Sequence, residues 1–105
     1  MRLALILLLS LLGPAAIAAP DAKLVTQGQA LLDKNCSRCH AIGATGDSSH
    51  AQAPPFRVVA RKYPPASLAE ALAEGIVSGH PDMPEFTFEP SEIEAIIAYL
   101  ETLGR

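Results

Sequence analysis

Apolar residues recur along this chain at helical spacing, and no segment alternates between apolar and polar residues as a half-buried strand would. One apolar face predicts a first helix from about Asp21 to Cys36. Its members are Leu24, Gly28, Leu31 and Leu32. Because glycine weakens an isolated helix, we expect Gly28 to let another helix approach closely; a tolerated surface glycine is the alternative.

Two further helices are predicted in the second half of the chain. One begins at Ser67, which forms a capping box with Glu70, and ends at Gly79. Its buried stripe consists of Leu68, Leu72 and Ile76. The other begins with Pro90 at its first position and ends at Gly104. Its apolar positions, which follow the i, i+3, i+4, i+7 pattern, are Ile93, Ile96, Ile97 and Leu100.

Long polar segments separate these helices. Residues 41–53 are rich in glycine and serine and predict a loop. Pro54-Pro55-Phe56 ends that loop, and a short helix is expected to follow it through Arg61. The whole pattern predicts an all-α domain of three or four helices joined by long loops. Such loops are unusual in a small domain unless something large packs beneath them.

The amino-terminal residues have the pattern of a cleavable secretory signal peptide. A basic start at Met1-Arg2 is followed by an apolar run from Leu3 to Leu12, and Ala16-Ile17-Ala18 resembles a cleavage site. The run is shorter than the roughly 20 residues that span a bilayer, and an uncleaved anchor is the alternative. We therefore expect residues 1–18 to be removed on export and residues 19–105 to form one domain.

The charge and size of the expected mature chain limit the classes of partner that it can bind. The whole chain has 8 basic and 11 acidic residues, and the expected signal peptide holds one of the basic ones, which leaves a net charge of −4. This acidic balance argues against binding to nucleic acid or to anionic lipid. About 87 residues without a tryptophan form only a small core. A buried cofactor would supply the apolar volume that such a chain lacks.

The stretch Cys36-Ser37-Arg38-Cys39-His40 contains the only two cysteines of the chain. Cys-x-x-Cys-His is the attachment pattern of c-type haem, in which two thiols form thioethers with the porphyrin and the histidine ligates iron. Two intervening residues place the sulfurs about one helical turn apart. A redox dithiol, a structural disulfide and a zinc site completed by His50 and His80 are the alternatives. The dithiol usually follows a βαβ pattern, which is absent before Cys36.

A haem held in this way takes its second axial ligand from another part of the chain. Met83 is the only methionine of the expected mature chain, and it lies in His80-Pro81-Asp82-Met83-Pro84, a loop stiffened by its prolines. A His/Met pair is typical of electron transfer and raises the reduction potential. His80 is the rival ligand, which would give bis-histidine ligation and a lower potential. We expect His50, in a polar loop, to be solvated.

These features together resemble class I cytochrome c over nearly the whole expected mature chain. Gly28 and Leu32 precede the Cys-x-x-Cys-His motif as in the first helix of that family, and Ile97-Ala98-Tyr99-Leu100 matches its last helix. Met83-Pro84-Glu85-Phe86 resembles its distal motif. The resemblance implies the cytochrome c fold around one haem c bound through both cysteines. It also implies that Gly28 packs against Tyr99 where the two helices cross.

The resemblance assigns further roles around the haem. It implies that the Pro54 carbonyl, with Pro55 as runner-up, accepts the Nδ1–H of His40 and so fixes the ring. Phe56 would form the apolar wall of the proximal side. The chain has no tryptophan to bind a haem propionate. The residues that could take this role are Tyr63, Arg57 and Arg61.

The implied function is electron transfer, not catalysis. With iron held by His40 and Met83, no coordination position is open for a substrate. We therefore expect a soluble, monomeric electron carrier of a bacterial periplasm, which meets redox-protein partners through transient interfaces below about 1,200 Å². A small cytochrome subunit of a periplasmic dehydrogenase or oxidase complex is one alternative. A gas-binding or peroxidatic haem protein, in which Met83 leaves the iron open, is the other.

Overall fold

The computed structural model describes residues 12–14, 21–76 and 79–104. Its elements in chain order are α1 (Ala22–Cys36), α2 (Phe56–Lys62), the 3-10 helix η1 (Pro65–Leu68), α3 (Ala69–Glu74) and α4 (Pro90–Leu103). No described residue lies in a strand. The expected all-α class with long connecting loops is therefore confirmed.

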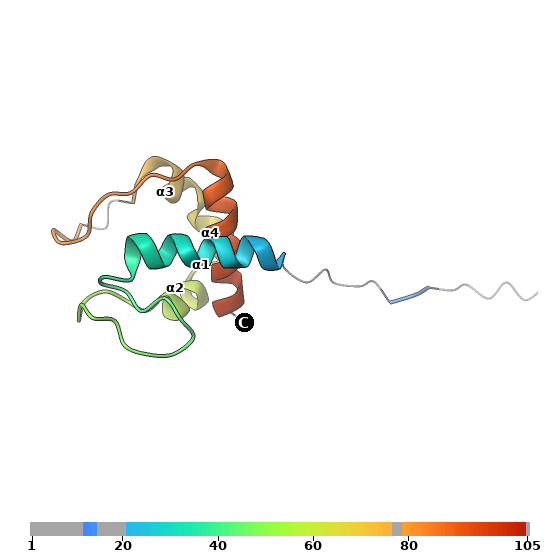
Figure 1. Cartoon of the computed structure of the whole chain (residues 1–105), viewed down its shortest axis with the longest axis horizontal. Coiled ribbons are helices and arrows are strands. Elements are labelled where there is room, and N and C mark those ends of the chain that lie inside the picture. Colours follow the sequence, from blue (N-terminus) through green and yellow to red (C-terminus); the bar gives the residue numbers. More distant parts are fainter. Residues whose placement is uncertain (1–11, 15–20, 77–78, 105) are drawn as a thin grey trace, which may run out of the picture.

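Helices α1 and α4 cross at the centre of the molecule (Figure 1). Gly28 is buried at this crossing. A Cβ atom added to Gly28 would overlap the carbonyl oxygen of Ala95 and would lie 2.9 Å from Tyr99 Cβ. The missing side chain therefore lets the two helix backbones touch, which confirms the expected close approach of Gly28 and Tyr99.

Helix α4 supplies most of the hydrophobic core. Its buried residues are Ile93, Ala95, Ile96, Tyr99, Leu100 and Leu103. Leu32 of α1, Ala60 of α2 and Leu72 of α3 belong to the same cluster. Each of the other α-helices thus contributes one buried residue to a hydrophobic cluster that is centred on α4.

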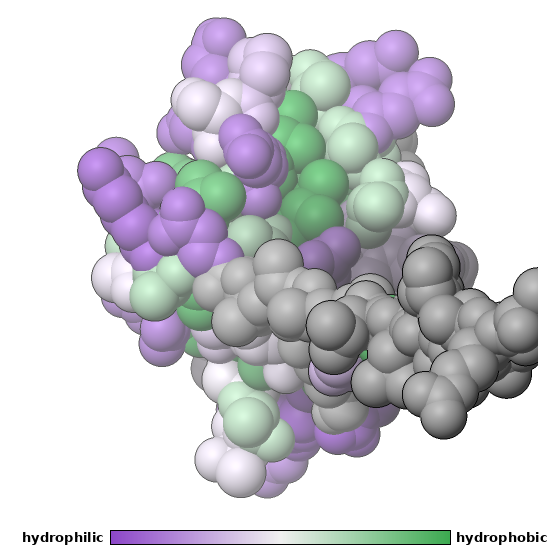
Figure 2. All heavy atoms as spheres, turned by 90° about the vertical axis from the view of Figure 1, so that its right-hand side faces the viewer, coloured by the Kyte–Doolittle hydropathy of each residue, from purple (hydrophilic) through white to green (hydrophobic). Residues whose placement is uncertain are grey.

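The face turned toward the amino-terminal end of α1 carries both apolar and hydrophilic residues (Figure 2). The apolar residues gather in one strip, and hydrophilic residues frame it on several sides. The long loops lie elsewhere, on the side of the molecule where α1 ends (Figure 1). The apolar strip and the long loops therefore lie on different sides of the molecule.

The last helix agrees with its prediction. It begins with Pro90 in its first turn and gives way to Gly104 at its carboxyl end. The backbone N–H of Glu89 donates to Glu92 Oε1 at 3.0 Å. This bond satisfies an amide that an uncapped helix end would leave without a partner.

The third predicted helix differs from the structure at both ends. It begins as η1, with Pro65 in its first turn, and Ser67 lies inside that 3-10 turn. Leu68 takes the N-cap position of α3 without a side-chain hydrogen bond, so the predicted capping box is wrong. Gly75, not Gly79, ends the helix, because its φ of +104° is a conformation that glycine adopts readily.

Most of the residues to which the signal-peptide prediction applies lie outside the described ranges. The predicted signal peptide, apart from residues 12–14, and its cleavage site lie outside the described residues. Within the described ranges, no helix has the length and apolar character that crossing a bilayer requires.

Candidate functional site

The Cys-x-x-Cys-His motif lies where α1 ends. Cys36 is the last residue of the helix, and the chain continues in a tight turn. The backbone N–H groups of Cys39 and His40 both donate to the carbonyl of Cys36, at 3.1 and 2.9 Å. The turn therefore keeps both thiols and the imidazole close to one helix end.

Both cysteines are unpaired and partly buried. Burial raises the pKa of the Cys36 thiol to about 11, so this thiol is protonated at neutral pH. Reactive dithiols instead have a lowered thiol pKa, which argues against a redox dithiol. In the described chain, the group of potential metal ligands that gathers in one place is His50, His80 and Asp82. Because it contains neither cysteine, the structure gives no support to a cysteine-based zinc site.

His40 is fixed by two contacts. Its Nδ1 lies 2.7 Å from the carbonyl oxygen of Pro54. A carbonyl oxygen can only accept, so Nδ1 carries the proton and Nε2 keeps the lone pair that a metal needs. The ring of Phe56 stacks on the imidazole, with centroids 4.7 Å apart and planes 14° apart. Both contacts were predicted, with Pro54 rather than Pro55 as the acceptor.

The proximal loop, residues 41–55, is tied to the rest of the fold by hydrogen bonds. The backbone N–H of His50 donates to the carbonyl of Cys39 at 3.2 Å. The Tyr99 hydroxyl of α4 donates to the carbonyl of Ile42 at 2.5 Å. The loop that presents Pro54 to His40 is thus anchored both to the motif and to the core.

Arg57 follows Phe56 on α2 and has an unusual environment. Its Nη1 atom is buried, and no protein atom in the described chain accepts a hydrogen bond from it. A buried guanidinium nitrogen without an acceptor is costly. An anionic group bound beside His40 would supply the acceptor, as the predicted propionate role of Arg57 requires.

Met83 lies in the distal loop, residues 79–89, which precedes α4. Its backbone N–H donates to the carbonyl of His80 at 3.2 Å, and its side chain is partly buried. The N–H of Phe88 donates to the carbonyl of Leu72 at 2.9 Å and ties the loop to α3. Both loops extend on the side of the molecule where α1 ends (Figure 1). The structure therefore places the Met83 loop on the same side as the motif.

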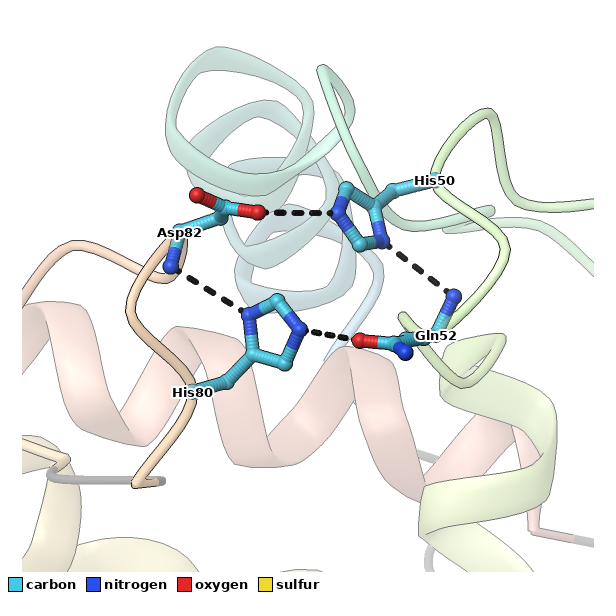
Figure 3. Close-up of polar contacts among 4 residues, drawn as sticks. All are labelled: His50, Gln52, His80 and Asp82. Carbon is cyan, nitrogen blue, oxygen red and sulfur yellow. Dashed lines mark hydrogen bonds and ion pairs between the residues drawn. The ribbon is translucent and has the colours of Figure 1, made fainter.

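Neither Tyr63 nor His50 contacts His40 in this structure as Pro54 and Phe56 do. Tyr63 follows α2, is 48% exposed, and has the Lys62 ammonium 5.4 Å from its ring centroid, so it is not among the buried residues of the site. His50 was expected to be solvated, and its side chain is 32% exposed. It is partly buried, and its Nε2 lies 3.5 Å from Asp82 Oδ2 of the distal loop (Figure 3). Sequence reasoning missed this contact because neither loop has a periodicity that pairs their residues.

Comparison with protein families identifies the kind of site. The family model described as cytochrome c oxidase, cbb3-type, subunit III matches residues 23–100, from the second residue of α1 to Leu100 of α4. No curated protein and no solved structure gives a significant match. A cytochrome c domain binds haem c covalently. The free thiols, the oriented imidazole and the unsatisfied Arg57 nitrogen fit that group.

Proposed function

We propose that this chain, which belongs to the family of cbb3-type cytochrome c oxidase subunit III, is a soluble periplasmic electron carrier. His40 and Met83 are its axial iron ligands. The haem c of such a domain supplies a one-electron couple between ferrous and ferric iron. The observation that carries the proposal is the 2.7 Å bond from His40 Nδ1 to Pro54, which leaves Nε2 as the ligating nitrogen.

The chain's own residues hold and orient the group. Cys36 and Cys39 provide the thiols for the two thioether links. Pro54 and Phe56 hold the His40 ring in one orientation, so the ligand does not rotate between oxidation states. Arg57 would donate from Nη1 to a propionate and would place a positive charge beside it.

The partners of His80 favour Met83 as the second ligand. In the ring of His80, Nδ1 accepts the backbone N–H of Asp82 at 3.3 Å, and Nε2 contacts Gln52 Oε1. Ligation of iron by His80 would therefore break one of these two contacts. Met83 is the remaining residue of the loop with a suitable side chain, since its thioether is a known axial ligand.

This ligand set accounts for the proposed activity. Two protein ligands leave no open coordination position, so the domain moves electrons and does not bind a substrate at iron. A thioether ligand and an apolar surrounding both disfavour the more positive ferric state. The acidic chain would meet its electron donor and acceptor in small, transient contacts.

The test is the optical spectrum and the reduction potential of the purified, exported protein. Met83→Ala should abolish the sulfur-to-iron charge-transfer band of the ferric protein and should lower the potential. His80→Ala is the matched control from the same loop and should leave both unchanged. If His80→Ala alters them and Met83→Ala does not, the distal ligand is His80 and the proposal is wrong.

The family match itself favours a second candidate function. The matching family is named for a subunit of an oxidase, so the same haem chemistry could serve a fixed partner within a periplasmic dehydrogenase or oxidase complex. Size-exclusion chromatography of the native extract separates the two. A carrier elutes as a single chain, which has a mass of 11.0 kDa before the expected signal peptide is removed, whereas a subunit co-elutes with a larger enzyme. Carbon monoxide binding to the reduced protein at neutral pH would instead indicate an open-site haem protein.

A further inference from the structure

The proximal and distal loops meet at a cluster of four polar side chains, those of His50, Gln52, His80 and Asp82 (Figure 3). His50 Nε2 lies 3.5 Å from Asp82 Oδ2. The rings of His50 and His80 meet edge to face, with centroids 5.2 Å apart. Two residues of the cluster come from each loop, and none of the four is needed by the proposed electron transfer.

Three members of this cluster carry metal-ligating atoms that converge. One ligand atom each from His50, His80 and Asp82 lies within 4.8 Å of the other two. Two imidazoles and a carboxylate suit divalent transition-metal cations such as Zn²⁺. Mg²⁺ and Ca²⁺ prefer sites made of oxygen alone, and Cu⁺ prefers sulfur. The donor set therefore selects one class of cation.

We propose that His50, His80 and Asp82 form a second metal site, which binds a divalent transition-metal cation such as Zn²⁺ and joins the proximal loop to the distal loop. Solvent would complete the coordination sphere. None of the three is a proposed iron ligand, and the site rests on the proposed function in one respect: His80 must not be the distal ligand of iron.

The site is accessible to an ion from solvent. The side chains of His50 and Asp82 are 32% and 69% exposed. Zinc bonds of about 2.1 Å place tetrahedral ligand atoms about 3.4 Å apart, so the three atoms, now up to 4.8 Å apart, must move closer by roughly 1.4 Å at most. Neither loop contains a fully buried residue, so this movement does not disturb the core.

Binding also requires changes at both imidazoles. Whichever ring nitrogen of His80 binds the cation must give up its present contact, with the backbone N–H of Asp82 or with Gln52 Oε1. Nδ1 of His50 accepts the backbone N–H of Gln52 at 3.2 Å, so the neutral ring carries its proton on Nε2, facing Asp82. A cation at Nε2 would replace that proton and shift it to Nδ1. The long bond from Gln52 would then be exchanged for one to water, since that residue is exposed. The Asp82 carboxylate faces the Nε2–H of His50 before binding and the cation after it.

The proposal is tested by calorimetric titration of the haem-loaded, full-length protein with Zn²⁺ in a buffer that does not chelate metals. We expect one zinc ion per chain. Asp82→Asn and His50→Gln should each weaken binding at least tenfold, because each removes one of three protein ligands. Asp47→Asn is the matched control: it changes an exposed carboxylate of the same loop that lies outside the cluster.

Thermal unfolding gives an independent measurement. A cation that binds only the folded chain raises its Tm, so zinc should raise the Tm of the unaltered protein and of Asp47→Asn but not of Asp82→Asn. The proposal is overturned if the unaltered protein binds no zinc, or if Asp82→Asn and His50→Gln both bind it as tightly as the control does. An unchanged haem spectrum in each variant shows that such a failure concerns this site and not the proposed function.

Discussion

The α1–α4 crossing and the two loops that carry the site are held by different kinds of contact. Every fully buried apolar side chain of the described chain lies on a helix, and the crossing brings two backbones together at Gly28. The proximal and distal loops contain no fully buried residue. They are held by single hydrogen bonds, such as those from His40 to Pro54 and from Tyr99 to Ile42, and by a few partly buried side chains, such as Ile42 and Phe88, that pack against the core.

Because of this difference, the stability of the fold and the properties of the site depend on different parts of the chain. Apolar burial is non-directional and accumulates over many contacts, so the crossing determines whether the chain folds. A hydrogen bond contributes about 1 kcal/mol net but has a defined geometry, so the loops determine where ligand atoms lie. We therefore expect substitutions at the crossing to change stability and substitutions near the loops to change the properties of the haem.

The largest expected effect is that of Gly28→Leu. The added side chain would overlap Ala95 and Tyr99, and the two helices would have to separate. Overpacking of this kind costs about 3 kcal/mol or more, which would lower the Tm of a domain of this size by at least roughly 12 °C. Thermal unfolding of the haem-loaded protein, followed by circular dichroism, measures the loss.

Gly43→Ala is the matched control for that experiment. A Cβ at Gly43 would meet only the carbonyl oxygen of Thr45, at 3.8 Å, which is an ordinary contact. Its Tm should therefore change little. An equal Tm for Gly28→Leu and Gly43→Ala would show that the crossing does not control stability, and the contrast between the two regions would fail.

The helices of the crossing were also the part of the fold that sequence patterns predicted well. The expected first helix, from about Asp21 to Cys36, corresponds to α1, and the last one agrees with α4 from Pro90 to its end before Gly104. Both have several apolar residues at helical spacing, so many positions support the same assignment. The third helix had a shorter stripe, and its ends depended on single residues, Pro65 and Gly75.

Contacts between the loops could be predicted only in part. The bond from His40 to Pro54 followed from the resemblance to cytochrome c, because the motif and the proline occur in a recognisable order. The contact of His50 with Asp82 followed from nothing in the sequence. It depends on how two non-periodic segments, distant along the chain, are brought together by the helices that flank them. Such contacts are a property of the folded chain and not of a local pattern.

Arg57→Leu should have the second largest effect. It should change the reduction potential of the haem more than the stability of the helices. It removes the buried Nη1 donor, and a charged hydrogen bond to a propionate contributes about 2 kcal/mol. Loss of a nearby positive charge stabilises ferric iron, so the reduction potential should fall by roughly 40 mV, or about 1 kcal/mol for one electron. Potentiometric titration measures this shift.

Two variants separate charge from packing in that experiment. Arg57→Lys retains the charge and should recover most of the potential. Arg61→Leu changes an exposed arginine of the same helix, α2, and should leave the potential near that of the unaltered protein. A similar shift for Arg57→Leu and Arg61→Leu would mean that Arg57 does not contact the haem.

Tyr99→Phe should have the smallest effect and addresses the one side chain that belongs to both regions. The Tyr99 ring packs at the crossing, while its hydroxyl donates to the Ile42 carbonyl of the proximal loop at 2.5 Å. Phenylalanine keeps the packing and leaves that carbonyl without its donor, which costs about 1 kcal/mol. Hydrogen exchange should therefore rise at amides of residues 41–55 and not in α1 or α4.

Tyr63→Phe is the control: it removes a hydroxyl from a half-exposed ring and should change hydrogen exchange neither in the loop nor in the helices. If Tyr99→Phe loosened the helices as much as the loop, the hydroxyl would be part of the core, and the division between core and loops would not hold at this residue.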